Sequence, residues 1–138
     1  MKNAWFTLLA AWLVALLSTF AALFVGEVMM MAPCVLCWYQ RIFMFPLVFV
    51  LGIASYANDR RGALYALPLT VGGLLVAGYH SLLTLGLIPT GWVPCSAGVP
   101  CTNQKLDFFF GIEMPLLSLL AFIVIVGLLA RYWKKTSP

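Results

Sequence analysis

Four long apolar runs dominate the pattern of hydrophobic and polar positions along the 138-residue chain. Each run contains about 20 residues, so each would form an α-helix about 30 Å long, which matches the hydrocarbon core of a bilayer. None shows the polar face that a soluble amphipathic helix needs. The pattern therefore predicts an all-α membrane protein, a four-transmembrane-helix bundle with spans at about Ala4–Val25, Trp38–Ala57, Leu64–Leu87 and Pro115–Trp133.

Short breaks and one long loop separate these runs. Ala32-Pro33 closes the first gap, and a charged turn at 58–62 divides the second run from the third. The loop at about Ile88–Met114 joins the last two runs and is rich in glycine and proline. There is no internal repeat, so we expect residues 1–138 to form a single integral membrane domain.

The composition supports this class of protein. Hydrophobic residues make up 64% of the chain and charged residues only 9%, whereas a soluble domain has about 25% charged residues. The net charge of +4 comes from basic residues at the ends of the apolar runs. Because no basic stripe interleaves with exposed aromatic residues, nucleic-acid binding is not expected.

The distribution of lysine and arginine predicts the orientation. With four spans, Arg41 and Lys105 lie on one side of the membrane and the other six basic residues lie with the termini. The positive-inside rule then places both termini in the cytoplasm. A cleaved signal peptide is the alternative for the first run, whose apolar stretch is long for one. The six basic residues are Lys2, Arg60, Arg61, Arg131, Lys134 and Lys135.

The four cysteines form two spaced pairs, and the predicted topology places both pairs on the extracytoplasmic side, where disulfides persist. Cys34 and Cys37 stand at the start of the second helix, directly after Pro33. A helix N-terminus stabilises a thiolate, and Arg41, one turn beyond Cys37, favours the same anion. This pattern predicts a reactive dithiol. For Arg41 itself, snorkelling to the membrane interface is the alternative.

The second pair, Cys95 and Cys101, lies in the long loop. Gly98 and two flanking prolines favour a small turn-rich ring there, which a partner's thiol can reach. Two structural disulfides are the alternative to redox chemistry. A zinc site is a less favoured alternative, because this cysteine spacing differs from that of common zinc ribbons. Covalent haem needs histidine after the second cysteine of C-x-x-C, and here Trp38 follows Cys37.

One continuous segment carries a family resemblance. It reads Pro33-Cys34-Val35-Leu36-Cys37-Trp38-Tyr39-Gln40-Arg41 and resembles the bacterial disulfide-bond formation protein B family (DsbB), above all its short-loop BdbC-type members. The resemblance extends over essentially the whole chain, through Tyr79-His80, residues 94–101 and residues 111–115. It implies a multi-pass enzyme of the bacterial cytoplasmic membrane. Such an enzyme reoxidises a DsbA-like, thioredoxin-fold dithiol oxidase outside the cytoplasm and passes the electrons to a membrane quinone, ubiquinone or menaquinone.

The resemblance also implies a role for each cysteine. Cys95 receives the partner's thiolate in a mixed disulfide, and Cys101 is its pair-mate. Cys101 then exchanges with Cys34, which leaves Cys37 as the thiolate that faces the quinone. Only five residues separate Cys95 from Cys101, unlike the wide separation in long-loop members, so the order of exchange stays open.

Arg41 and His80 match the family residues beside the quinone. His80 is the only histidine in the chain, and a buried packing residue is the alternative for it.

Three other functions stay open. A vitamin K epoxide reductase-like enzyme would use the same dithiol chemistry differently, although the loop pair and Cys37–Arg41 argue against it. A membrane scaffold with structural disulfides would not be an enzyme. A small transporter or channel subunit is the third, but the spans hold few polar residues to line a path.

Overall fold

Four membrane-length helices make up most of the protein. The computed structural model describes residues 2–28, 30, 35–86, 105–106 and 112–137. Each helix in these ranges is long and apolar enough to cross a membrane, which confirms the predicted four-helix bundle. The helices are α1 (Lys2–Leu23), continued by the π-helix η1 (Phe24–Val28), α2 (Val35–Ala57), α3 (Arg60–Thr84) and α4 (Met114–Thr136).

Two short strands, which the sequence pattern did not predict, stand before α4. They are β1 (Lys105–Leu106) and β2 (Ile112–Glu113), and they pair antiparallel, with Lys105 opposite Glu113. The rest of the predicted long loop lies outside the described residues.

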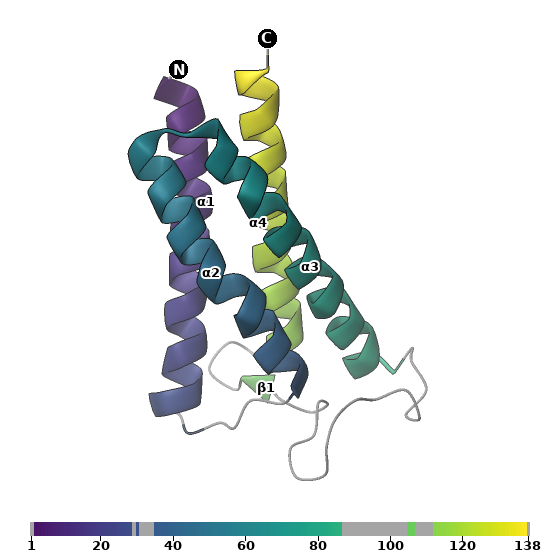
Figure 1. The fold of residues 1–138 in the computed structure, drawn as a ribbon. Coiled ribbons are helices and arrows are strands. Elements are labelled where there is room, and N and C mark those ends of the chain that lie inside the picture. Colours follow the sequence, from purple (N-terminus) through teal and green to yellow (C-terminus); the bar gives the residue numbers. More distant parts are fainter. Residues whose placement is uncertain (1, 29, 31–34, 87–104, 107–111, 138) are drawn as a thin grey trace.

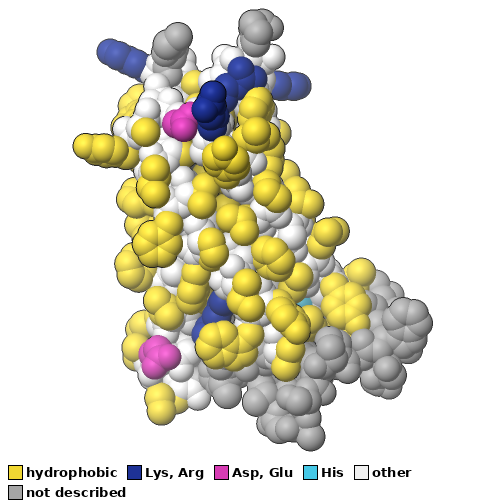
Figure 2. Space-filling view, viewed as in Figure 1, with side chains coloured by type: hydrophobic (Ala, Val, Ile, Leu, Met, Phe, Trp, Pro, Cys, Tyr) yellow, Lys and Arg dark blue, Asp and Glu magenta, His cyan; other side chains and the backbone are white. Residues whose placement is uncertain are grey.

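The helices close into a ring in which each helix packs on two neighbours, and α1 meets α4. Both termini lie at the same end of the bundle, together with the turn between α2 and α3 (Figure 1). The Nζ of Lys135 lies 3.5 Å from the carbonyl oxygen of Asn3, so the two terminal segments are adjacent. Figure 2 shows most visible lysine and arginine side chains at this end, above a broad hydrophobic surface.

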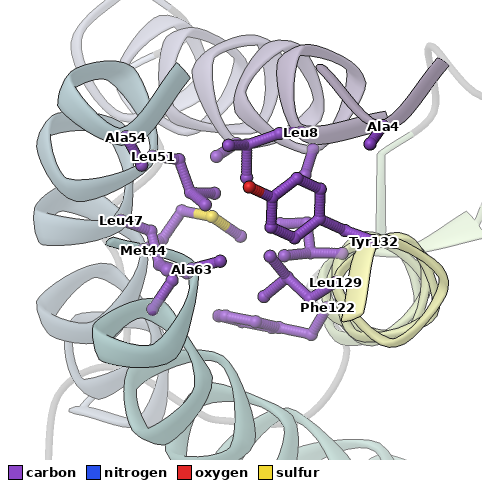
Figure 3. Close-up of a cluster of buried hydrophobic side chains, with 14 of the residues drawn as sticks. Ala4, Leu8, Met44, Leu47, Leu51, Ala54, Ala63, Phe122, Leu129 and Tyr132 are labelled. Carbon is purple, nitrogen blue, oxygen red and sulfur yellow. The ribbon is translucent and has the colours of Figure 1, made fainter. Parts of the chain in front are cut away.

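Buried side chains recur every three or four residues along most of each helix, so one face of each helix packs into the bundle. Side chains from all four helices meet in the centre (Figure 3). The opposite faces carry exposed large apolar side chains, such as Phe49 and Leu75, as expected of surfaces that contact lipid. The central residues include Ala4, Leu8, Ala11 and Ala15 of α1, Leu47 and Leu51 of α2, Ala63 and Ala66 of α3, and Phe122, Ile125 and Leu129 of α4.

Small residues let the helices approach closely. A Cβ atom at Gly73 of α3 would overlap the ring of Phe122 on α4, and one at Gly62 would overlap Ala54 on α2. Helix packing in lipid depends on such close contact, because lipid tails are as apolar as the side chains.

The charged turn between α2 and α3 is shorter than predicted, since α3 begins at Arg60 rather than Leu64. Asp59 is its N-cap, and the carboxylate accepts a hydrogen bond from the Arg61 amide at 2.9 Å. This bond satisfies one of the free N–H groups of the first helical turn. Trp5 of α1 donates its indole N–H to the carbonyl of Ser55 near the end of α2, at 2.8 Å. These contacts fix the end of the bundle that holds the termini.

Candidate functional site

The first turn of α2 holds the one predicted site cysteine that lies within the described residues. α2 begins at Val35, so Cys37 is in its first turn, where its side chain is half-buried. This agrees with the position expected from Pro33. The other three predicted site cysteines, Cys34, Cys95 and Cys101, lie outside the described residues.

Arg41 reaches from α2 to α1. Its guanidinium donates a hydrogen bond to the carbonyl oxygen of Ala22 at 2.9 Å. The guanidinium carbon also lies 5.4 Å from the centre of the Trp38 ring, within the range of a cation–π contact. The Arg41 side chain is half-buried, so helix α1 and Trp38 hold its charge in place.

The π-helix η1 lies beside this guanidinium. A Cβ atom at Gly26 would lie 3.0 Å from a guanidinium nitrogen of Arg41, so the absence of a side chain makes room for the charge. A π-turn widens a helix by one residue, and such turns occur frequently at functional sites. Glu27 is exposed on the same segment.

His80 lies in the bundle interior and contacts α2. Its side chain is fully buried, and its Nδ1 lies 2.9 Å from the amide nitrogen of Gln40, which is 7% exposed. The apolar run predicted that the third helix ends at about Leu87, seven residues after His80. α3 ends at Thr84, one turn after His80, because Gly86 takes a positive φ of 79° soon afterwards.

These contacts bring the predicted site residues of α2 and α3 together around one helical turn. Gln40 and Arg41 follow Cys37 by three and four residues, so all three occupy neighbouring positions within about 6 Å along the axis of α2. From this turn, Gln40 contacts His80 on α3, and Arg41 contacts Ala22 on α1. Cys37 therefore shares one turn of α2 with a cation and with an amide that contacts a buried imidazole, at the bundle end opposite the termini.

The outer face of this turn is aromatic. Trp38 and Tyr39 are 54% and 46% exposed, which is typical of the membrane interface. An apolar molecule dissolved in the bilayer can approach across such a surface. Within the described ranges, there is no cluster of three or more His, Cys, Asp or Glu side chains that could hold a metal ion.

Sequence reasoning missed the contacts that hold Arg41 and His80. Gln40 stood inside the quoted motif without a role, although it is the only amide side chain in α2 and lies three residues from Cys37. Its position in an apolar span was the available signal. The roles of Ala22 and Gly26 could not be predicted from the hydrophobic pattern. Ala22 acts through its backbone carbonyl, and Gly26 acts by having no side chain.

Comparison with known proteins gives consistent results. Residues 2–131 match the family described as "Disulfide bond formation protein DsbB". A "Probable disulfide formation protein" of Metapseudomonas resinovorans is 51% identical over 97% of this chain and 94% of its own length. "Disulfide bond formation protein C" of Bacillus subtilis (strain 168) is 42% identical over 91% of each chain. No solved structure matches the chain.

The family match covers nearly the whole chain, and the structure contains four candidate membrane spans. The relatives with high identity carry names of disulfide-forming proteins. This multi-pass membrane protein belongs to the DsbB family of disulfide bond formation proteins.

Proposed function

We propose that this protein is a quinone-dependent thiol–disulfide oxidoreductase of the bacterial cytoplasmic membrane. It reoxidises a DsbA-like, thioredoxin-fold dithiol oxidase on the extracytoplasmic side and passes the electrons to a membrane quinone. The observation that carries this proposal is the turn at Cys37, from which Arg41 contacts α1 and Gln40 contacts His80 on α3.

The described residues fit the headgroup of a quinone. A quinone ring is apolar and carries two carbonyl oxygens, so its site needs an apolar approach and hydrogen-bond donors. Trp38 and Tyr39 provide an exposed aromatic surface next to Cys37. Arg41 has five N–H donors, one of which goes to Ala22, and His80 adds an imidazole. When bound, the quinone supplies an acceptor for two electrons and two protons.

Each residue of the turn has a role in this chemistry. Cys37 is the thiolate that faces the acceptor, and the start of α2 favours its anionic form. Arg41 stabilises negative charge, both on the sulfur and on an oxygen that gains charge beside it. When Cys34 and Cys37 join in a disulfide, their two thiols release two electrons and two protons, which balances the reduction of one quinone to quinol.

The loop cysteines connect this turn to a protein partner. Cys95 accepts the partner's thiolate in a mixed disulfide, and Cys101 is the leaving sulfur. Cys101 then attacks the Cys34–Cys37 disulfide at Cys34 and releases Cys37 as a thiolate. The second thiol of the partner displaces Cys95, and the Cys95 thiolate displaces Cys34 from Cys101. The partner is then oxidised, the loop disulfide is formed again, and both electrons reside on Cys34 and Cys37. These roles rest on the family membership and on the position of Cys37 in α2.

The test is a single-turnover reaction. The purified protein is reduced with a dithiol, freed of reductant and mixed anaerobically with a short-chain quinone, while the quinone absorbance is followed. We expect two equivalents of quinone to be reduced when both cysteine pairs start as thiols, because the loop pair passes its electrons on through Cys34 and Cys37. A variant with Cys95→Ser and Cys101→Ser should reduce one equivalent, and Cys37→Ser should reduce none.

Alkylation and mass spectrometry before mixing verify that Cys34 and Cys37 are thiols. If they are thiols and the quinone absorbance stays unchanged, the proposal is wrong and a scaffold with structural disulfides is favoured. Equal quinone reduction by the Cys37→Ser variant would also contradict it, because the helix pair would then not be the electron donor.

A further inference from the structure

We propose that the bundle end with the termini carries a binding site for an anionic phospholipid, between the start of α1 and the turn that follows α2. A surface hollow of about 510 Å³ lies there, lined by Lys2, Trp5, Phe6 and Asn58. This volume is within the range of ligand sites in proteins, about 300–1,000 Å³. The hollow is separate from the proposed quinone site, because the first turn of α2 lies at the opposite end of the bundle (Figure 1).

The lining residues change from polar to aromatic towards the middle of the bilayer, in the same order as the parts of a phospholipid. Lys2 begins α1 and Asn58 directly follows α2, and both side chains are exposed. Trp5 and Phe6 stand about one turn further along α1, about 5 Å deeper. A phosphate at the polar end of the hollow would therefore continue into glycerol and acyl chains beside the two aromatic rings.

Contacts within the bundle hold the aromatic wall of the hollow. The indole N–H of Trp5 donates to the carbonyl oxygen of Ser55 at 2.8 Å, so the ring is held against α2. The centre of this ring lies 5.1 Å from that of Phe6, in an edge-to-face arrangement. Phe6 is 58% exposed, so the wall continues into the surface that contacts lipid, and an acyl chain can extend along it.

The polar end of the hollow provides hydrogen-bond donors and positive charge. Lys2 has three N–H donors and a full charge, and the amide of Asn58 adds two donors. Asp59 is the only acidic residue described at this end, and its carboxylate caps α3 by accepting from the Arg61 amide. Six basic residues of this end outnumber it. A headgroup with a net negative charge is therefore favoured over a zwitterionic one.

Native mass spectrometry of the full-length protein in micelles tests the site, with dioleoylphosphatidylglycerol and dioleoylphosphatidylcholine as the probes. The two lipids share the phosphate and the acyl chains, so a difference in their dissociation constants reports on the net charge of the headgroup. We expect the wild type to bind the anionic lipid about fivefold more tightly. Equal dissociation constants would overturn the proposal.

Two substitutions in the hollow and one control locate the site. Lys2→Gln should remove most of the preference for the anionic lipid. Asn58→Gly should weaken both lipids about fivefold, the effect of one lost hydrogen bond, and keep the preference. Glycine suits this position because Asn58 has a positive φ of 50°. Lys134→Gln removes an exposed lysine of the same end that does not line the hollow, so both dissociation constants should equal those of the wild type.

Three further results would contradict the proposal. A preference that persists in Lys2→Gln would exclude this lysine from the site. Equal loss of the preference in Lys134→Gln would mean that the lipid responds to the charge of the whole end and not to the hollow. Displacement of the lipid by an equal concentration of glycerol 1-phosphate would identify a soluble phosphate as the ligand. Lipid binding is measured without a quinone, so failure of the proposed function would leave these results unchanged.

Discussion

Arg41 shows how a single charge is accommodated inside an apolar span. An ionisable residue within a membrane helix is costly and needs partners. Arg41 has a backbone carbonyl on α1, Ala22, at 2.9 Å and the face of Trp38 at 5.4 Å. An arginine that only snorkels to the interface needs neither contact. The contacts favour a fixed cation beside Cys37, which is the role proposed for it.

Arg41→Ala should raise the quinone KM by roughly ten- to a hundredfold, the effect of one lost charge-assisted hydrogen bond. Arg41→Lys should give an intermediate KM, because lysine keeps the charge but lacks the planar fork of donors. The measurement is steady-state quinone reduction with a dithiol donor at saturating concentration. If Arg41→Ala has the wild-type KM, Arg41 is an interfacial anchor and not part of the quinone site.

For individual residues, the sequence predicted their relative positions within one helix but not their contacts with other helices. Cys37 and Arg41 could be related because their separation of four residues defines one helical turn. Gln40 and His80 are 40 residues apart, and their contact depends on how α2 and α3 are rotated about their axes. The hydrophobic pattern does not fix that rotation closely enough when nearly every residue is apolar.

Among the elements, the end of α1 differs most from expectation. The apolar run suggested a helix to Val25, whereas the helix continues as η1 to Val28 with π geometry. A π-turn has no simple sequence signature, so its prediction needs the contacts around it. Here those contacts are with Arg41, and the turn brings Gly26 to the guanidinium of that residue.

Gly26→Ala tests whether η1 positions the cation. The added methyl group would lie 3.0 Å from a guanidinium nitrogen, so the flexible end of Arg41 should move by a few tenths of an ångström. We expect the quinone KM to rise by about a few-fold, because the displaced guanidinium would no longer have the geometry that the quinone site needs. The thermal stability should not fall, because alanine is the better helix former.

Gly127→Ala on α4 is the control for this substitution. A Cβ atom there would meet nothing within 4 Å, so the KM should equal that of the wild type. A Gly26→Leu variant should exceed Gly26→Ala in its effect. Equal KM values for all four proteins would show that η1 does not control the position of Arg41.

For the whole molecule, the number of spans was predictable because length and apolarity alone define a membrane helix. Small residues such as Gly73, which packs against Phe122, became interpretable only once the neighbouring helix was known. The sequence also anticipated that the termini and the turn between α2 and α3 share one end of the bundle (Figure 1). Which side of the membrane that end faces is a separate question, and the positive-inside rule makes it testable.

We expect the end with the termini to face the cytoplasm and the Cys37 end to face outward. The test places single cysteines in a variant without the four native ones, and treats intact cells with a membrane-impermeant maleimide. Met30→Cys should be labelled, because Met30 is 81% exposed just beyond η1 at the Cys37 end. Ser137→Cys and Asn58→Cys, both at exposed positions of the opposite end, should be labelled only after lysis. The reverse pattern would place Cys37 on the cytoplasmic side, where thiols are kept reduced, and would contradict oxidation of an extracytoplasmic partner.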